Sequence, residues 1–305
     1  MLILRKKNSF LSSIDGSSLC PDAFKNLSKE AIEATPITTD QGPVPIAMAF
    51  HVDLCETIRQ ETILIQGNCT KLEKLGCQMK SGTLCILGDV GERTAQGLAG
   101  GRIVIAGNAG DHLGAGMKDG LIYVSGNCGN NLGSPLPGQK AGMRDGDVLI
   151  AGTAGNRACE RMRRGTVFIG GDLGTYAASQ MIAGSLVVAG EIGDHWGAGL
   201  RRGSIILFKD YAGEPSASLS DAREFELSFL PLLWKHIERV QMEALEILTD
   251  AIANAKGWLQ APVPNVPSPI KIPRTRWVQR QIADLNYQGR GEVLVLRRVS
   301  SPEVR

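Results

Sequence analysis

Histidines and cysteines are the side chains of this 305-residue chain most suited to metal binding or nucleophilic chemistry. His112 and His195 each follow an aspartate, but several repeats of the chain separate them, so they cannot share one metal ion. The sequence has no H-x-x-x-H or C-x-x-C motif of the kind that zinc sites use. Cys69, Cys77 and Cys85 are more typical of structural thiols than of a cluster site. We therefore predict no catalytic residue and no metal site in this chain.

A column of basic side chains is the feature closest to a binding site. The same position in successive repeats holds Lys80, Lys118, Arg144, Arg163 and Arg201, with Arg164 and Arg202 beside two of them. Like charges stacked about 5 Å apart repel one another unless an anion or an acidic surface lies over them. The column is thus a candidate contact for an anion or a partner. A solvated face, relieved by Asp119 and Asp145, is the simpler alternative.

These residues are positioned by a repeat that spans Gly82 to Phe208. Apolar strands open with Gly82, Gly101, Gly120, Gly146, Gly165, Gly184 and Gly203. The openings are 19 residues apart, except Gly120 to Gly146, where an insertion around Ser134–Lys140 makes the interval 26. A fixed period near 20 is typical of a solenoid.

Each repeat predicts one strand with an inward apolar face. The second and fourth residues after each opening glycine are aliphatic, and a Met or Leu lies three residues before it. Most repeats continue into a G-x-x-G corner, where glycine supplies positive φ or a backbone without Cβ. We predict a mainly β, right-handed parallel β-helix of about 19-residue coils, because such units bury their apolar face by stacking. An array of antiparallel hairpins would need two similar strands in every repeat.

A second apolar row points away from this predicted core. The third residue after the opening glycine reads Cys85, Val104, Tyr123, Leu149, Phe168, Val187 and Ile206. An apolar row of this size should not face water. The sequence leaves two covers open, the chain's own C-terminal helix and a partner subunit, and Tyr123, Leu149, Phe168, Val187 and Ile206 are the candidate interface residues.

The chain divides into four predicted segments. Residues 1–60 form a capping segment, with an edge strand at Leu2–Leu4 and short helices over 21–27 and 28–34. Residues 61–210 form the β-helix. Residues 211–260 form a helical extension, because Leu230 to Ile252 have helical apolar spacing. Residues 261–305 form a proline-rich linker and a tail that ends in a strand-like Gly291–Leu296.

Composition argues against a nucleic-acid-binding, membrane or secreted protein. The net charge of +2 gives no general attraction for nucleic acid or membranes, and no apolar run of 18 residues occurs. Seven cysteines and a start unlike a signal peptide predict reduced thiols in the cytoplasm. We expect no nucleic acid or membrane partner.

The serial G-[ND]-x-G repeats, each with Met or Leu before the opening glycine, resemble those of the C subunits of formylmethanofuran dehydrogenases. Within this family, the C subunits of bacterial formyltransferase/hydrolase complexes are the more similar, and the C-terminal domain of the glutamate synthase large subunit is a more distant relative. The start and the insertion are similar to both groups of C subunits, in Leu19-x-Pro21, Gly67–Gly76 and Pro137–Met143. The tail favours the bacterial complexes, in Phe229–Leu233 and Asp284–Leu294. The proline-rich linker departs from the family pattern.

The resemblance implies a non-catalytic structural subunit. The complex would transfer formyl from formyl-tetrahydromethanopterin to methanofuran and release formate. Its metals and these cofactors would be held by other subunits, namely amidohydrolase-like A, B and formyltransferase D subunits. The alternatives are an equivalent of the C subunits of molybdenum or tungsten formylmethanofuran dehydrogenases, and a glutamate synthase-like coupling domain. A binding role also stays open, in which the basic column holds an acidic partner or the polyglutamyl tail of a methanofuran-type cofactor.

Overall fold

Eight strands of the protein come from the repeats. The computed structural model describes residues 1–55, 61–259, 264–287 and 289–297. The repeat strands are β6 (Thr62–Gln66), β8 (Thr83–Leu87), β9 (Ala99–Ile105), β10 (Asp119–Val124), β11 (Asp147–Ile150), β12 (Thr166–Ile169), β13 (Ser185–Val188) and β14 (Ser204–Leu207). Each pairs in parallel with the next, and the partners are equivalent positions of the repeat. Ile122 still pairs with Val148 across the longer interval, so the insertion leaves the register unchanged.

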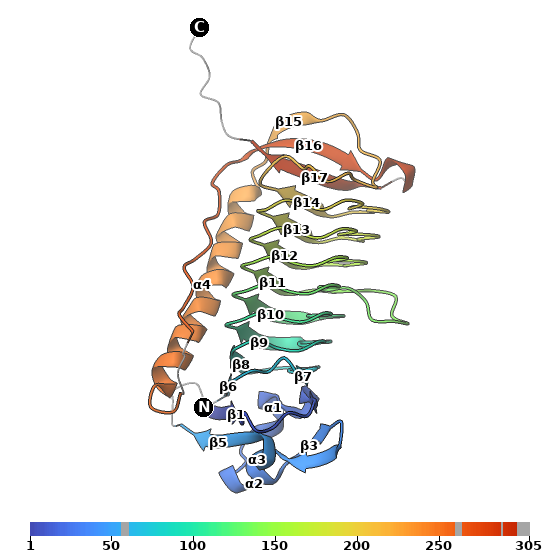
Figure 1. Cartoon of the computed structure of the whole chain (residues 1–305). Coiled ribbons are helices and arrows are strands. Elements are labelled where there is room, and N and C mark those ends of the chain that lie inside the picture. Colours follow the sequence, from blue (N-terminus) through green and yellow to red (C-terminus); the bar gives the residue numbers. More distant parts are fainter. Residues whose placement is uncertain (56–60, 260–263, 288, 298–305) are drawn as a thin grey trace.

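The two ends of the chain add five strands to this sheet. They are β1 (Leu2–Lys6) and β5 (Phe50–Leu54) at one end, and β15 (Arg223–Glu226), β16 (Trp277–Ala283) and β17 (Gly291–Leu296) at the other. The resulting sheet has 13 strands in the order β15-β16-β17-β14-β13-β12-β11-β10-β9-β8-β6-β1-β5. Figure 1 shows the strands stacked as a rod, with one long helix beside them. A mainly β chain with a large, mostly parallel sheet is confirmed.

The N-terminal segment closes one end of the rod. It contains α1 (Pro21–Phe24), α2 (Lys29–Ala34), α3 (Ile46–Ala49) and the 3-10 turn η1 (Gly16–Ser18). Its strands β4 (Gly42–Pro45), β3 (Pro36–Thr39) and β2 (Ile14–Asp15) form a small sheet with β7 (Leu72–Glu73), which follows β6. The two short helices predicted here are present, and Ser28 caps α2 by accepting a hydrogen bond from the Ala31 N–H. The predicted edge strand is wrong in one respect. β1 lies inside the sheet because β5 pairs with its free side.

The interior of the stack is filled by the predicted inward residues. Equivalent aliphatic side chains such as Leu84, Ile103 and Ile122 are fully buried, as is Met117 from the position before the opening glycine. A second ladder of parallel bridges joins successive repeats at their corners, from Cys69–Val90 through to Leu173–Ile192. Each repeat is therefore bonded to its neighbour at two places.

Glycine is required at two kinds of position in the repeat. All seven opening glycines have φ between 79° and 107°, which L side chains rarely adopt. The corner glycines have a different reason. A Cβ on Gly174 would lie 2.7 Å from the backbone carbon of Gly155 in the preceding repeat. Close stacking of backbone on backbone excludes a side chain there.

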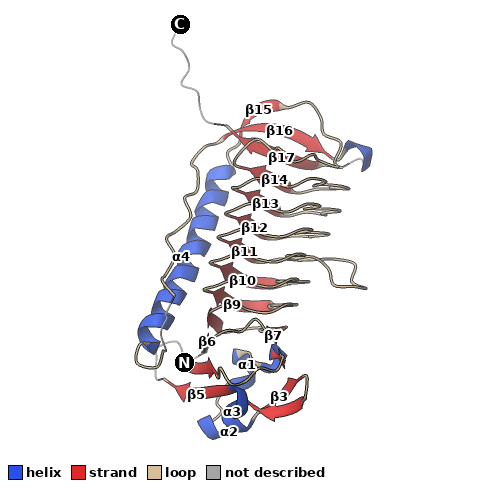
Figure 2. Ribbon diagram, viewed as in Figure 1, coloured by secondary structure: helices blue, strands red, loops and turns tan. Residues whose placement is uncertain are grey.

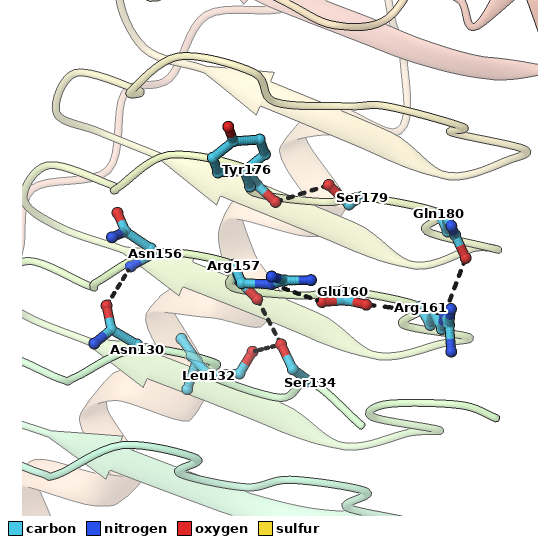
Figure 3. A network of polar contacts seen from close by, with 10 residues as sticks. All are labelled: Asn130, Leu132, Ser134, Asn156, Arg157, Glu160, Arg161, Tyr176, Ser179 and Gln180. Atoms are coloured by element: carbon cyan, nitrogen blue, oxygen red, sulfur yellow. Dashed lines mark hydrogen bonds and ion pairs between the residues drawn. The ribbon is translucent and has the colours of Figure 1, made fainter. Parts of the chain in front are cut away.

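Polar side chains at the corners link one repeat to the next. The Asp111 Oδ1 atom accepts a hydrogen bond from the Asn130 N–H (2.7 Å), and the Asn130 Oδ1 atom accepts one from the Asn156 N–H (2.9 Å). Figure 3 shows the second of these bonds beside a bond from the Ser134 hydroxyl to the Arg157 carbonyl. Where an Asn or Asp follows a corner glycine of the regular repeats, its side chain thus satisfies a backbone donor of the next repeat.

Helix α4 (Leu230–Ala255) covers the outer face of the sheet. Figure 2 shows it running alongside the strands on one side. Trp234, Ile237, Val240, Ala244 and Leu248 recur at helical spacing and are buried. They pack against the outward row and its continuations on β1, β6 and β17. Pro231 lies in the first turn of the helix, where its missing N–H is tolerated.

One hydrogen bond and one ion pair fix how far along the sheet the helix lies. His236 Nε2 is 2.8 Å from Asp147 Oδ1 on β11, and Arg102 on β9 pairs with Glu243. The described part of the proline-rich stretch returns along the rod without regular structure (Figure 1), and the Trp234 indole N–H donates to the Thr275 carbonyl at 3.2 Å. The chain then forms β16, the 3-10 turn η2 (Leu285–Tyr287) and β17. No helix within the described residues is both long enough and apolar enough to cross a membrane.

Alanine at Gly174 tests the stacking of the corners. We expect Gly174→Ala to lower the free energy of unfolding by about 1–3 kcal/mol, because the added methyl overpacks the backbone of the preceding repeat. Gly257→Ala is the control, since nothing lies within 4 Å of its Cβ. Urea unfolding followed by circular dichroism measures both, and equal stabilities would contradict the argument.

Two residues of α4 test its attachment to the sheet. Trp234→Ala should cost roughly 3–5 kcal/mol, because it removes a large side chain buried against Phe208, whose ring centroid is 5.7 Å away. Leu232→Ala, at a position 69% exposed on the same helix, should change stability by less than about 0.5 kcal/mol. Thermal unfolding of the two variants distinguishes these outcomes, and similar losses would show that α4 is not packed as described.

Candidate interaction surface

Three of the five predicted basic positions come together in one groove. Arg144, Arg163 and Arg201 line an open depression of about 740 Å³ with their neighbours Arg164 and Arg202. The groove crosses the loops that lead into β11 to β14. Ile182 and Ala183, from the repeat that ends in β13, complete its lining. All five arginines are exposed.

These arginines have no carboxylate partner among the residues that the structure describes. Some arginines elsewhere do, for example Arg5 with Asp53 at 2.7 Å and Arg280 with Glu292 at 2.9 Å. Asp145, next to Arg144, directs its Oδ1 atom to the Gly146 N–H at 2.9 Å. The groove is therefore a positively charged surface, and no carboxylate of the described residues pairs with its arginines.

The remaining predicted basic residues lie outside this groove. Lys118 is exposed two residues before the opening glycine of β10 and is not among the lining residues. Lys80 lies in the N-terminal part of the rod, beside Asp22 of α1, whose Oδ2 atom accepts a hydrogen bond from the Lys80 N–H at 2.8 Å. Burial alone would raise the pKa of Asp22, but hydrogen bonds from Lys80 and Ser81 and the charge of Lys80 hold that pKa below its ordinary value.

The sequence reasoning missed Arg290 as a member of the column. Ser204 of β14 pairs with Glu292 of β17, so Arg290 takes the repeat position of Arg202 one strand further along. The Arg290 N–H donates to the Arg201 carbonyl at 2.6 Å, and the residue is exposed. A glycine-opened apolar strand directly after an arginine was the available signal, because Gly291–Leu296 has the pattern of the other repeats.

The outward apolar row is enclosed within the chain. Tyr123, Phe168, Val187 and Ile206 are fully buried and Leu149 is 1% exposed, all in the cluster that α4 completes. Of the two possible covers, the chain's own helix occupies the face. The assignment of these five residues to a partner interface stays a prediction, and a partner could touch them only after α4 had moved away.

Two buried side-chain atoms at the boundary between α4 and the sheet have no hydrogen-bond partner within the described structure, the Tyr123 hydroxyl and Gln241 Nε2. Burial raises the pKa of Tyr123 to about 12. Burial likewise raises the pKa of the Cys69, Cys85 and Cys159 thiols to about 12. Thiols with such pKa values are poor nucleophiles at neutral pH, consistent with structural cysteines.

The two repeat histidines stay far apart, as expected. His112, Asn131, Arg157, Tyr176 and His195 occupy one position of successive repeats and share a left-handed backbone with φ between 58° and 61°. Tyr176 stacks on His195 with ring centroids 5.0 Å apart. Within the described residues, no three His, Cys, Asp or Glu side chains are arranged to hold a metal ion.

The structure of this chain is similar to that of a chain in a solved complex. No protein-family model matches the chain, and no curated protein matches it. It is similar to a chain in the crystal structure of the formyltransferase/hydrolase complex (FhcABCD) from Methylorubrum extorquens in complex with methylofuran. The identity is 27%, the TM-score is 0.77, and the match covers 97% of this chain and 100% of that chain. The likeness therefore extends over nearly the whole length of both chains.

The contact between Asp22 and Lys80 predicts a pH-dependent contribution to stability. A carboxyl group whose pKa is lower in the folded than in the unfolded chain stabilises the fold above its unfolded pKa, here about 3.8. That contribution is lost as the pH falls through the folded value. We expect Asp22→Ala to destabilise the protein at pH 7 and the difference from the wild type to shrink below about pH 4. Urea unfolding of both proteins across this range measures it, and a difference independent of pH would contradict the prediction.

Proposed function

We propose that the chain is a non-catalytic structural subunit, equivalent to the C subunits of formyltransferase/hydrolase complexes. Such a complex would transfer a formyl group from formyl-tetrahydromethanopterin to methanofuran and release formate in one-carbon metabolism. The observation that carries the proposal is the end-to-end likeness to one chain of the Methylorubrum extorquens complex. A match over 97% of one chain and 100% of the other is expected of equivalent subunits rather than of a shared module.

The construction of the chain supports a structural role. Its polar corner residues bond to the backbone of the next repeat, and its buried thiols have raised pKa values. These groups maintain the stack and are not directed into a reaction site. We infer that the stack winds as a right-handed parallel β-helix, because parallel strands joined through one sheet connect with that hand.

The proposal assigns the chemistry to other subunits. Methanofuran, tetrahydromethanopterin and the metals would be held by amidohydrolase-like A, B and formyltransferase D subunits in the cytoplasm. The solved relative was crystallised with methylofuran, which is consistent with a methanofuran-type cofactor at the level of the complex. For this chain we retain the four segments 1–60, 61–210, 211–260 and 261–305, although β17 joins the last of them to β14.

A native pull-down with this chain as bait tests the proposed function. We expect an amidohydrolase-like subunit and a formyltransferase subunit to co-purify in fixed ratio. A molybdenum or tungsten subunit instead would indicate a formylmethanofuran dehydrogenase, and a glutaminase would indicate a glutamate synthase-like system. Recovery of the chain alone as a stable monomer would contradict the proposal.

A further inference from the structure

Six arginines form a ladder that crosses the stacked repeats, and they come from distant parts of the sequence. Arg144, Arg163 and Arg201 occupy one position, with Arg164 and Arg202 beside them. Arg290 extends the ladder by one strand, because β17 pairs with β14. The described residues offer these side chains no carboxylate partner.

The spacing of the ladder fits an extended chain better than a single small anion. The strands β11, β12, β13, β14 and β17 are successive neighbours, so Arg144 and Arg290 are four strand intervals apart, about 19 Å. An extended peptide advances about 3.3 Å per residue and would span this distance with roughly six residues. In the middle of the groove, Ile182 and Ala183 take the positions that the arginine pair holds in the neighbouring repeats.

The chemistry of the groove selects carboxylates. Guanidinium groups bind carboxylates through two parallel charge-assisted hydrogen bonds. Alternate side chains of an extended segment point to the same side at intervals of about 7 Å, so several carboxylates could each reach an arginine of the ladder. A tract rich in Glu or Asp on another protein subunit therefore complements the groove in both charge and length.

We propose that the arginine groove formed by residues 144, 163, 164, 201 and 202, and extended by Arg290 one strand further along, docks an extended, carboxylate-rich segment of a partner subunit. The inference rests on the proposed function for the source of that segment, a subunit of the same complex. The recognition of an acidic peptide by the groove does not depend on which complex it is.

Binding of a labelled α-linked hexaglutamate peptide to the full chain tests the recognition, by fluorescence anisotropy at low and at physiological salt. We expect measurable affinity that falls with salt and is at least about tenfold weaker in the variant R163E/R201E, since two charge-assisted pairs become repulsive. R163Q/R201Q should give an intermediate loss. The control K140E/K235E has the same change in net charge at exposed positions outside the groove and should bind as the wild type does.

Three outcomes would overturn the inference about recognition. One is equal weakening in the groove and control variants, which would indicate general electrostatic attraction. Another is competition by inorganic phosphate at the same concentration as by peptide, which would indicate a point-anion site. The third is tighter, arginine-dependent binding of an oligothymidylate of matched charge, which would indicate nucleic acid.

A photo-crosslink in the assembled complex tests the source of the segment. A p-benzoylphenylalanine at position 182, in the lining of the groove, should crosslink to an acidic tract of a partner subunit, and one at position 140 should not reach that tract. If partners co-purify but position 182 crosslinks to a non-acidic segment or to no peptide, the inference fails while the proposed function stands. If the wild-type chain recruits no partner in the pull-down, the proposed function fails whatever the peptide result.

Discussion

The structure depends on covering a sheet that is apolar on both faces. Side chains alternate along every strand, so the residue between the two inward positions of each repeat points outward, and here it is apolar as well. Ten successive strands from β1 to β17 are parallel neighbours and extend about 43 Å. Helix α4 has 26 residues and a length of about 39 Å, which nearly matches that span. One helix can therefore close almost the whole outer face.

This cover explains why the rod can carry an exposed charged groove. The inner and outer apolar layers are both complete within the chain, and the ends of the stack are closed by β5 and by β15 and β16. The corners need only glycine and an Asn or Asp to stack. The stack does not need the side chains that lie two residues before the opening glycines of β11, β12 and β14. In these three repeats they are arginines.

The sequence predicted the parts of the fold that repeat. The inward positions, the corner glycines and the helical spacing of Leu230 to Leu248 each follow from local periodicity. β16 was not predicted, because Trp277–Ala283 has polar residues in mid-strand and acquires its place only by pairing with β17. β1 lies inside the sheet only because β5 pairs with it. A signal for β5 was present in the sequence, because Phe50 and Val52 alternate with a polar His51 as in a half-buried strand.

The candidate site was predicted in part, for a related reason. A shared repeat position brought Arg144, Arg163 and Arg201 together. Arg290 joins them because β17 pairs with β14, and the repeat pattern of Gly291–Leu296 that signals this lies far along the chain from the other repeats. The sequence also left open what covers the outward row, because apolar surfaces attract any apolar partner. Specific contacts such as His236 with Asp147 fix α4 in place, and these appear only in the folded chain.

The most direct test of the account is a crosslink between α4 and the sheet. The variant R102C/E243C replaces a contacting pair on β9 and α4, and a short bismaleimide would join the new thiols. If α4 covers its own sheet, the crosslink forms within one chain, and the product keeps the mass of a monomer. A dimeric product would show that the helix covers a second copy, and absence of a crosslink would show that the outer face is covered by something else.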